Sequence, residues 1–207
     1  MKASKSRPAE TSDTLLARLR EAPHVAKAVD ARAAVARLID EAPKDVSAPL
    51  GELIASNLLV ERLLHGLFEG SPYLWGIVAS GPELLLRLLR ESPEAEIERI
   101  VARHAETALA ADSDTDAQIA LRAMKREGAL LIALADIGGV WSLDEVTAAL
   151  TRLADTAVRA SVDRLLGAAA KSGKLKAADS SDPARGSGYI VLAMGKHGAG
   201  ELNYSSD

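Results

Sequence analysis

Apolar residues recur three and four positions apart through most of the chain, from about residue 13 to residue 170. This spacing places side chains on one face of an α-helix, because a helix turns once in about 3.6 residues. The apolar share is 48% but the aromatic share is only 3%, so the apolar residues are mostly Ala and Leu, which are strong helix formers. The sequence therefore predicts a mainly α protein with a core of packed helices.

Proline and glycine divide this region into successive helices, because proline cannot continue a helix and glycine weakens one. The strongest single pattern spans residues 53–68, which we expect to form one helix that stops at Gly70-Ser71-Pro72. Ser142 and Glu145 have the spacing of a capping box, which marks the start of a helix that runs to about residue 170. Further helices are expected before Pro23, before Pro43, over residues 73–80, after Gly81-Pro82, after Ser92 and over about 116–137.

The composition changes after residue 170. Residues 171–188 are rich in Lys, Ser, Gly and Asp and lack apolar periodicity, as is typical of a linker or an exposed loop. The run Tyr189–Met194 is the one convincing strand pattern, because it is apolar throughout and includes β-branched residues. Four parts are therefore expected: a mobile tail over 1–12, a helical region over 13–170, a linker over 171–188, and a first strand with its glycine turn over 189–207.

Composition also excludes several classes of site and partner. The chain has no cysteine, which rules out disulfides, zinc–thiolate sites and cysteine nucleophiles. The net charge of −4 gives no overall attraction to nucleic acid or to anionic lipid, so neither a nucleic acid nor a membrane is expected as a partner. No signal peptide or membrane span is recognisable, and we expect a cytoplasmic protein.

Metal-binding patterns in the helical region fail on inspection. The run Asp112–Asp116 resembles the start of a calcium loop, but Ala117 occupies the position at which the loop needs glycine. His24, His65 and His104 are scattered singly, without the spacing of a metal-binding pair. We expect the acidic run to cap the following helix and the histidines to have ordinary packing or surface roles.

The residues after the predicted strand carry the most chemical information. Gly195, Lys196, Gly198 and Gly200 form a glycine-rich turn, in which backbone N–H groups can face an anion and lysine adds a positive charge. An acidic residue, Asp207, follows after a further short segment. A strand, a glycine turn, a lysine and a carboxylate suit phosphate and Mg²⁺. They equally suit a plain strand–turn connection in an α/β domain, and the residues alone leave both readings open.

The longer segment Met194–Asp207, called the signature segment below, resembles a family motif. It reads Met-Gly-Lys-His-Gly-Ala-Gly-Glu-Leu-Asn-Tyr-Ser-Ser-Asp. This is similar to the signature of the glutamine synthetase adenylyltransferase/adenylyl-removing family, which belongs to the DNA polymerase β-like nucleotidyltransferases. The stretches Arg122–Glu127, Leu130–Asp136 and Trp141–Thr147 also look like the upstream helices of that family. The likeness is good over about residues 110–207, and His197 departs from it because leucine is usual there.

The resemblance implies a function and roles for individual residues. Such enzymes regulate glutamine synthetase by transferring AMP from ATP to one of its tyrosines and by removing that AMP with phosphate, which releases ADP. This chain would belong to the adenylyl-removing half, and its C-terminal residues would begin an α+β nucleotidyltransferase domain. Glutamine synthetase and the PII signalling protein would be its partners. Asp207 would be a catalytic carboxylate that binds Mg²⁺, while Gly195, Lys196, Ser205 and Ser206 would bind phosphate or nucleotide.

The family's metal site has a second aspartate two positions after the first, and the sequence stops at Asp207. We therefore expect a fragment that is inactive by itself, with residues beyond about 185 poorly packed and the apolar run Tyr189–Met194 exposed. Two alternatives remain. The helices could be a non-catalytic module that binds glutamine synthetase or a regulator, or the chain could belong to another nucleotidyltransferase that shares the glycine turn.

Overall fold

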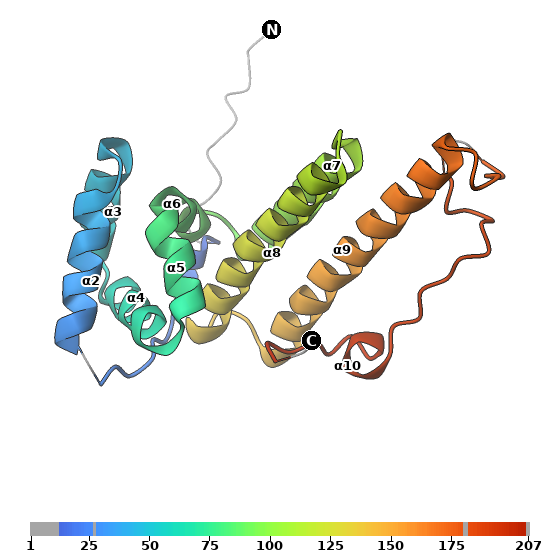
Figure 1. Ribbon diagram of the computed structural model, residues 1–207. Helices are drawn as coiled ribbons and strands as arrows, with labels where there is room; N and C mark the ends of the chain where they lie inside the picture. Colours follow the sequence, from blue (N-terminus) through green and yellow to red (C-terminus); the bar gives the residue numbers. More distant parts are fainter. Residues whose placement is uncertain (1–12, 27, 180–181, 206–207) are drawn as a thin grey trace, which may run out of the picture. The chain divides into compact units, whose positions relative to one another are not determined.

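The computed structural model describes residues 13–26, 28–179 and 182–205, and these residues form ten helices, α1 to α10, and no strand (Figure 1). The tail expected over residues 1–12 lies outside the described residues. The chain divides into two compact units. Unit 1 comprises the chain up to Pro93 together with Ile137–Val140, and unit 2 comprises Glu94–Asp136 and the chain from Trp141 onward. The expected mainly α fold is confirmed.

Unit 1 is built from six helices whose boundaries follow the proline and glycine positions. The breaks near Pro43, at Ser71 and at Gly81 lie where the sequence predicts them. The helices are α1 (Leu15–Arg18), α2 (Ala28–Glu41), α3 (Lys44–Ser56), α4 (Leu58–Gly70), α5 (Pro72–Ser80) and α6 (Pro82–Arg90).

The single helix predicted over residues 53–68 is wrong, because the structure divides it at Asn57 into α3 and α4. Asn57 has an extended backbone, and its side-chain oxygen accepts hydrogen bonds from the amides of Leu59 and Val60 at 3.0 and 3.3 Å. These bonds satisfy two of the amides that a helix leaves unpaired at its start. A local polar cap therefore interrupts an apolar pattern that by itself favours continuation.

Leucine side chains form the core of unit 1. Leu50, Leu63, Leu85 and Leu88 are at most 1% exposed, and burying one such side chain contributes about 1.5–3 kcal/mol. Two backbone contacts bring distant parts of the chain into this unit: Leu15 N–H donates to Glu91 O at 2.8 Å and Arg20 N–H donates to Gly138 O at 2.9 Å.

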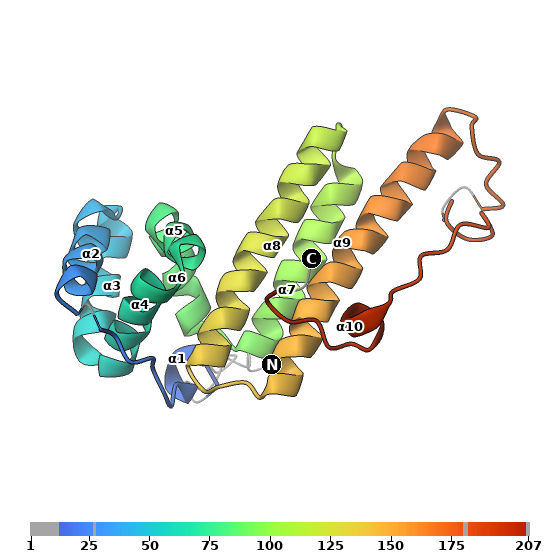
Figure 2. The ribbon, with the colours of Figure 1, turned by 60° about the horizontal axis from the view of Figure 1, so that its bottom comes forward.

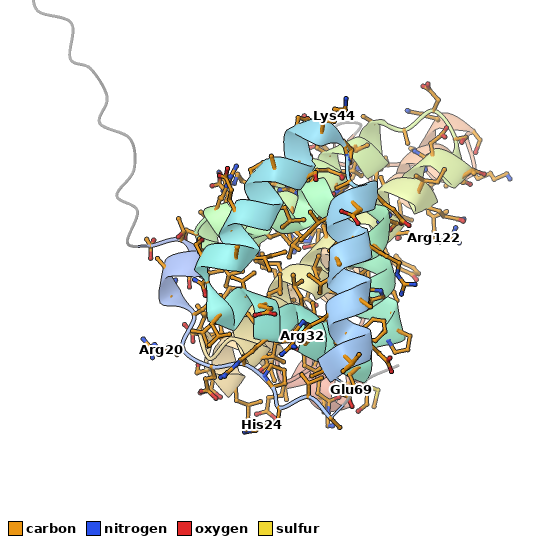
Figure 3. All side chains as sticks on the ribbon, turned by 90° about the vertical axis from the view of Figure 1, so that its left-hand side faces the viewer. Arg20, His24, Arg32, Lys44, Glu69 and Arg122 are labelled. Carbon is orange, nitrogen blue, oxygen red and sulfur yellow. The ribbon has the colours of Figure 1, made fainter. Side chains whose placement is uncertain are left out.

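The segment that leads into α2 is also held by a side chain of α4. Figure 3 shows His24 and Glu69 at the same end of unit 1. Close to them, the amide of Ala26 donates to the Glu69 carboxylate at 2.8 Å.

Two of the single histidines noted in the sequence have packing positions. His65 is buried within α4, and His104 lies beside Glu127 of α8.

Unit 2 contains three long helices that run side by side, α7 (Pro93–Ala110), α8 (Asp114–Ile137) and α9 (Leu143–Lys171), followed by the single turn α10 (Gly195–Gly198) (Figures 1 and 2). Glu127 of α8 joins α7, with Arg103 Nη2 at 2.6 Å and His104 Nε2 at 3.0 Å from its carboxylate oxygens. Between α8 and α9, a Cβ added to Gly128 would lie 2.6 Å from Cδ1 of Leu153. Glycine at this position therefore lets α9 approach α8 closely.

The ends of these helices are capped by side chains. Ser142 and Glu145 form the predicted capping box: the Ser142 amide donates to the Glu145 carboxylate at 2.7 Å, and the Glu145 amide donates to Ser142 Oγ at 3.4 Å. At the start of α8 the Asp116 amide donates to Ser113 Oγ at 3.1 Å, so the acceptor is a serine within the acidic run, whereas the sequence predicts one of its acids. Arg164 of α9 reaches the end of α7 and donates to Ala111 O at 2.7 Å. A cation suits this place because the carbonyls at a helix C-terminus carry partial negative charge.

The strand expected over Tyr189–Met194 does not form; these residues are irregular coil. A strand needs a neighbour for its backbone hydrogen bonds, and the described residues include no other extended segment that pairs with it. The expected exposure of the run is confirmed: Ile190, Leu192 and Met194 are 76%, 77% and 82% exposed.

Within the part of the chain that the structure describes, no helix combines the length and the apolar character needed to cross a membrane.

The capping box generates a prediction for stability. Replacing Ser142→Ala removes the cap of α9 and should lower the free energy of unfolding by about 1 kcal/mol, measured as a lower midpoint in thermal or urea unfolding followed by circular dichroism. Ser161→Ala is the matched control, because this serine lies inside α9 and its hydroxyl only returns to Ala157 O four residues earlier. The control should be neutral or slightly stabilising. Equal losses in both variants would contradict the capping role.

Candidate functional site

The glycines of the signature segment are each required by the backbone. Gly195 and Gly200 have φ angles of +56° and +77°, which lie in the left-handed region that side chains with a Cβ rarely adopt. At Gly198 a Cβ would lie 2.5 Å from the carbonyl oxygen of Ala193, which no real contact allows. The sequence Gly-x-x-Gly-x-Gly therefore specifies one compact turn, in which α10 is the central element.

Most amides of this turn are engaged within it. The N–H groups of Gly198, Ala199, Gly200 and Glu201 donate to the carbonyl oxygens of Met194, Gly195, His197 and Lys196, at 2.7 to 3.1 Å. In this conformation these four donors face their own backbone. They are therefore not available to an anion, and anion binding at Gly195 and Lys196 stays a prediction.

The structure places three of the five predicted site residues. Gly195 and Lys196 open α10, and the Lys196 side chain is exposed. Ser205 lies in an exposed turn, where its hydroxyl contacts Asn203 Oδ1 at 3.2 Å. Ser206 and Asp207 lie outside the described residues. Within the described ranges, no three His, Asp or Glu side chains gather closely enough to hold a metal ion.

Three side chains of α8 and α9 contact the signature segment. His197 Nε2 lies 2.8 Å from Asp155 Oδ1, and the Leu202 amide donates to Thr151 Oγ1 at 3.2 Å. The Tyr204 hydroxyl donates to Asp136 Oδ2 at 2.9 Å. The partners are 42, 51 and 68 residues apart in sequence. Residues 198–201 and Tyr204 are nevertheless exposed, as the expected poor packing beyond residue 185 implies, and these three hydrogen bonds are what ties the segment to the helices.

The surface next to these contacts is hollowed in two places. A groove of about 550 Å³ is lined by Trp141, Arg152, Asp155 and Gly200, together with three glutamates. Its carboxylates outnumber its single arginine, which disfavours an anion there. A second groove, of about 720 Å³, lies along α9 and the coil before α10, and its acidic and basic side chains balance. Neither groove includes Lys196.

Sequence reasoning missed the partners of the signature segment. Asp136 lies in a stretch that carries the family resemblance, but nothing in the sequence connects it with Tyr204. Thr151 and Asp155 belong to no recognised motif and only their spacing of four residues places them on one face of a helix. No pattern in a single sequence indicates contacts over such separations.

The structure and the sequence together define a class of protein: a mainly helical chain with a glycine–lysine turn, whose residues His197, Leu202 and Tyr204 contact the last two long helices, α8 and α9. A family model described as Glutamate-ammonia ligase adenylyltransferase matches residues 61–207, and the chain belongs to this family. This match confirms the resemblance seen in the signature segment. It disfavours the alternative that the chain belongs to another nucleotidyltransferase that shares only the glycine turn.

Curated relatives agree with the family match. The chain is 46% identical to a bifunctional glutamine synthetase adenylyltransferase/adenylyl-removing enzyme of Xanthobacter autotrophicus, over 91% of this chain and 19% of the relative. It is 42% identical to a protein of the same name from a Bradyrhizobium species, over 98% of this chain and 20% of the relative. The chain thus spans about a fifth of the length of these relatives. No solved structure gives a significant match.

The contact between Tyr204 and Asp136 generates a prediction for titration. Partial burial and the hydrogen bond to the Asp136 carboxylate both disfavour the phenolate and raise the pKa of Tyr204 above its ordinary value. The stability linked to this proton is complete below the ordinary value of about 10 and is lost as the pH rises through the raised pKa. An absorbance titration of tyrosinate should therefore show a late phase, which Tyr204→Phe abolishes and Tyr73→Phe preserves. A late phase that persists in Tyr204→Phe would contradict this assignment.

Proposed function

We propose that this chain is the adenylyl-removing part of an enzyme that regulates glutamine synthetase by adding and removing AMP. The observation that carries the proposal is the signature segment, with its lysine, serines and aspartate in family order, together with family membership over residues 61–207. The names of the relatives include both activities. The assignment to the removing half is what the family resemblance implies, and neither the family match nor the names of the relatives distinguishes the two halves.

The proposed reaction is a phosphorolysis. An oxygen of inorganic phosphate attacks the phosphorus of the AMP group on a tyrosine of glutamine synthetase. The bond between that phosphorus and the tyrosine oxygen breaks, the tyrosine oxygen takes up a proton, and ADP leaves. Charge develops on the attacking and leaving oxygens, so the site must supply positive charge and hydrogen-bond donors to both.

Residues of the signature segment suit these tasks. Lys196 is an exposed cation at the start of the turn and would hold phosphate together with the backbone at Gly195. Ser205 and Ser206 would donate hydrogen bonds to phosphate or nucleotide oxygens. Asp207 would bind Mg²⁺, because a carboxylate oxygen is a ligand that this ion prefers. When bound, the ion supplies positive charge to the transferred phosphoryl group.

Glutamine synthetase and the PII signalling protein are the proposed partners, and ADP and ATP the proposed nucleotides. The family motif has a second aspartate two positions beyond Asp207, and a pair of metal ions needs more than one carboxylate. The 207-residue chain by itself is therefore proposed to be inactive. The alternative, a helical module that only binds glutamine synthetase or a regulator, predicts binding without any ADP release from the longer protein.

The activity is tested with adenylylated glutamine synthetase, inorganic phosphate and Mg²⁺, with ADP release measured by a coupled assay. The 207-residue chain should release no ADP. The protein encoded by the complete gene should release ADP, and its Asp207→Asn variant should lose at least about 100-fold in kcat, as expected when a metal-binding carboxylate is removed.

The matched control in this assay is Asp182→Asn, the same change in the loop before the signature segment, where the Asp182 side chain accepts a hydrogen bond from the Arg185 amide. It should retain full activity. ADP release by the 207-residue chain would overturn its proposed inactivity. Full activity of Asp207→Asn would overturn the role of this carboxylate. Absence of ADP release from the complete protein, with glutamine synthetase still bound, would favour the binding module.

A further inference from the structure

Three contacts join the signature segment to α8 and α9. They occur at His197, Leu202 and Tyr204, so they restrain α10 and the coil that leads to Ser205. One contact uses a backbone amide and two use side chains. Together they restrain both the path and the rotation of the segment that the proposed function places next to phosphate and metal.

Thr151 is the best defined of the three partners. Its side chain is only 9% exposed, and its hydroxyl donates to Thr147 O at 2.8 Å. A hydroxyl has one hydrogen, so the oxygen is left to accept, and it accepts from the Leu202 amide. The bond inside α9 thereby orients the acceptor before the signature segment binds to it.

The helix α9 presents two opposite faces in this region. Thr151 and Asp155 are four residues apart and lie on one face, toward the signature segment. Leu153 is two residues from each of them, about 200° around the helix, and it packs in the notch at Gly128 of α8. Packing on the inner face therefore fixes the rotation of α9 and, with it, the positions of Thr151 and Asp155.

We infer that Asp136, Thr151 and Asp155 are positioning residues, which hold residues 197–204 of the signature segment in place next to the turn at Gly195 and Lys196 that the proposed function assigns to phosphate. This role rests on the proposed function and deepens it, because it assigns to the helical unit a part in building the site. His197 takes part in the same contact: where the family resemblance leads one to expect leucine, this chain has a side chain that pairs with Asp155.

The positioning role is tested first by hydrogen–deuterium exchange over residues 195–205 of the 207-residue chain. Thr151→Val keeps the shape of the side chain but removes the acceptor, so exchange of the Leu202 amide should become about 3- to 10-fold faster, as expected for the loss of one hydrogen bond. Thr151→Ser keeps the hydroxyl and should restore protection. Exchange in α7 and α8, and the thermal midpoint, should change little.

The acidic partners are tested in the same way. Asp136→Asn and Asp155→Asn should each raise exchange across residues 197–204, and Asp163→Asn is the matched control, because this aspartate lies on α9 two turns beyond Asp155. A double-mutant cycle of Asp155→Asn with His197→Leu should show effects that do not add, because the first change removes the charge of the shared contact and the second removes the contact itself. Unchanged exchange in Thr151→Val, Asp136→Asn and Asp155→Asn, or a rise in the control Asp163→Asn equal to theirs, would overturn the inference.

A kinetic measurement on the complete protein separates positioning from plain stability. Thr151→Val should lower kcat for ADP release by about 10-fold or more while KM for phosphate stays within about 2-fold, because a displaced site loses reactive geometry rather than binding. Thr151→Ser should recover kcat. Normal kcat in Thr151→Val would overturn the role in catalysis. The two claims fail in different ways. If the wild type releases no ADP while the exchange results are as predicted, the proposed function is wrong and the contacts stand.

Discussion

The close approach of α9 to α8 is the contact on which the rest of unit 2 depends. Gly128 leaves room for Leu153, and this fit sets how α9 is rotated about its axis. Since a helix is rigid over a few turns, the rotation fixed by Leu153 also fixes the opposite face. That face holds Thr151 and Asp155, and through them the residues of the signature segment. The packing of α9 on α8 and the placement of the contacts at Thr151 and Asp155 are therefore linked through one helix.

The signature segment itself combines internal order with dependence on its surroundings. Its turn needs glycine at positions 195, 198 and 200, and its amides from Gly198 to Glu201 are satisfied within the segment. The turn is thus specified locally. Its placement is not, because contacts to Asp136, Thr151 and Asp155 come from residues more than forty positions away. The segment is therefore ordered only when the bonds within its turn and the contacts to α8 and α9 are both present.

The sequence predicted the elements whose causes are local. The capping box at Ser142 and Glu145 is present, and the breaks at Ser71 and Gly81 lie where proline and glycine demand them. Two predicted elements failed for different reasons. Asn57 was overlooked because an apolar period masks a polar cap. Tyr189–Met194 was predicted as a strand although strand formation depends on a neighbouring strand, which a propensity argument does not supply.

The sequence by itself determined the helical class of this protein, its family through the signature segment, and the glycine positions of the turn, because each of these depends on residues that are near one another in the chain. Only the tertiary structure decided that the turn lies against α9 and that His197, Leu202 and Tyr204 find partners on α8 and α9. These contacts join residues 42 to 68 positions apart, and they exist only after helix packing has oriented the acceptors.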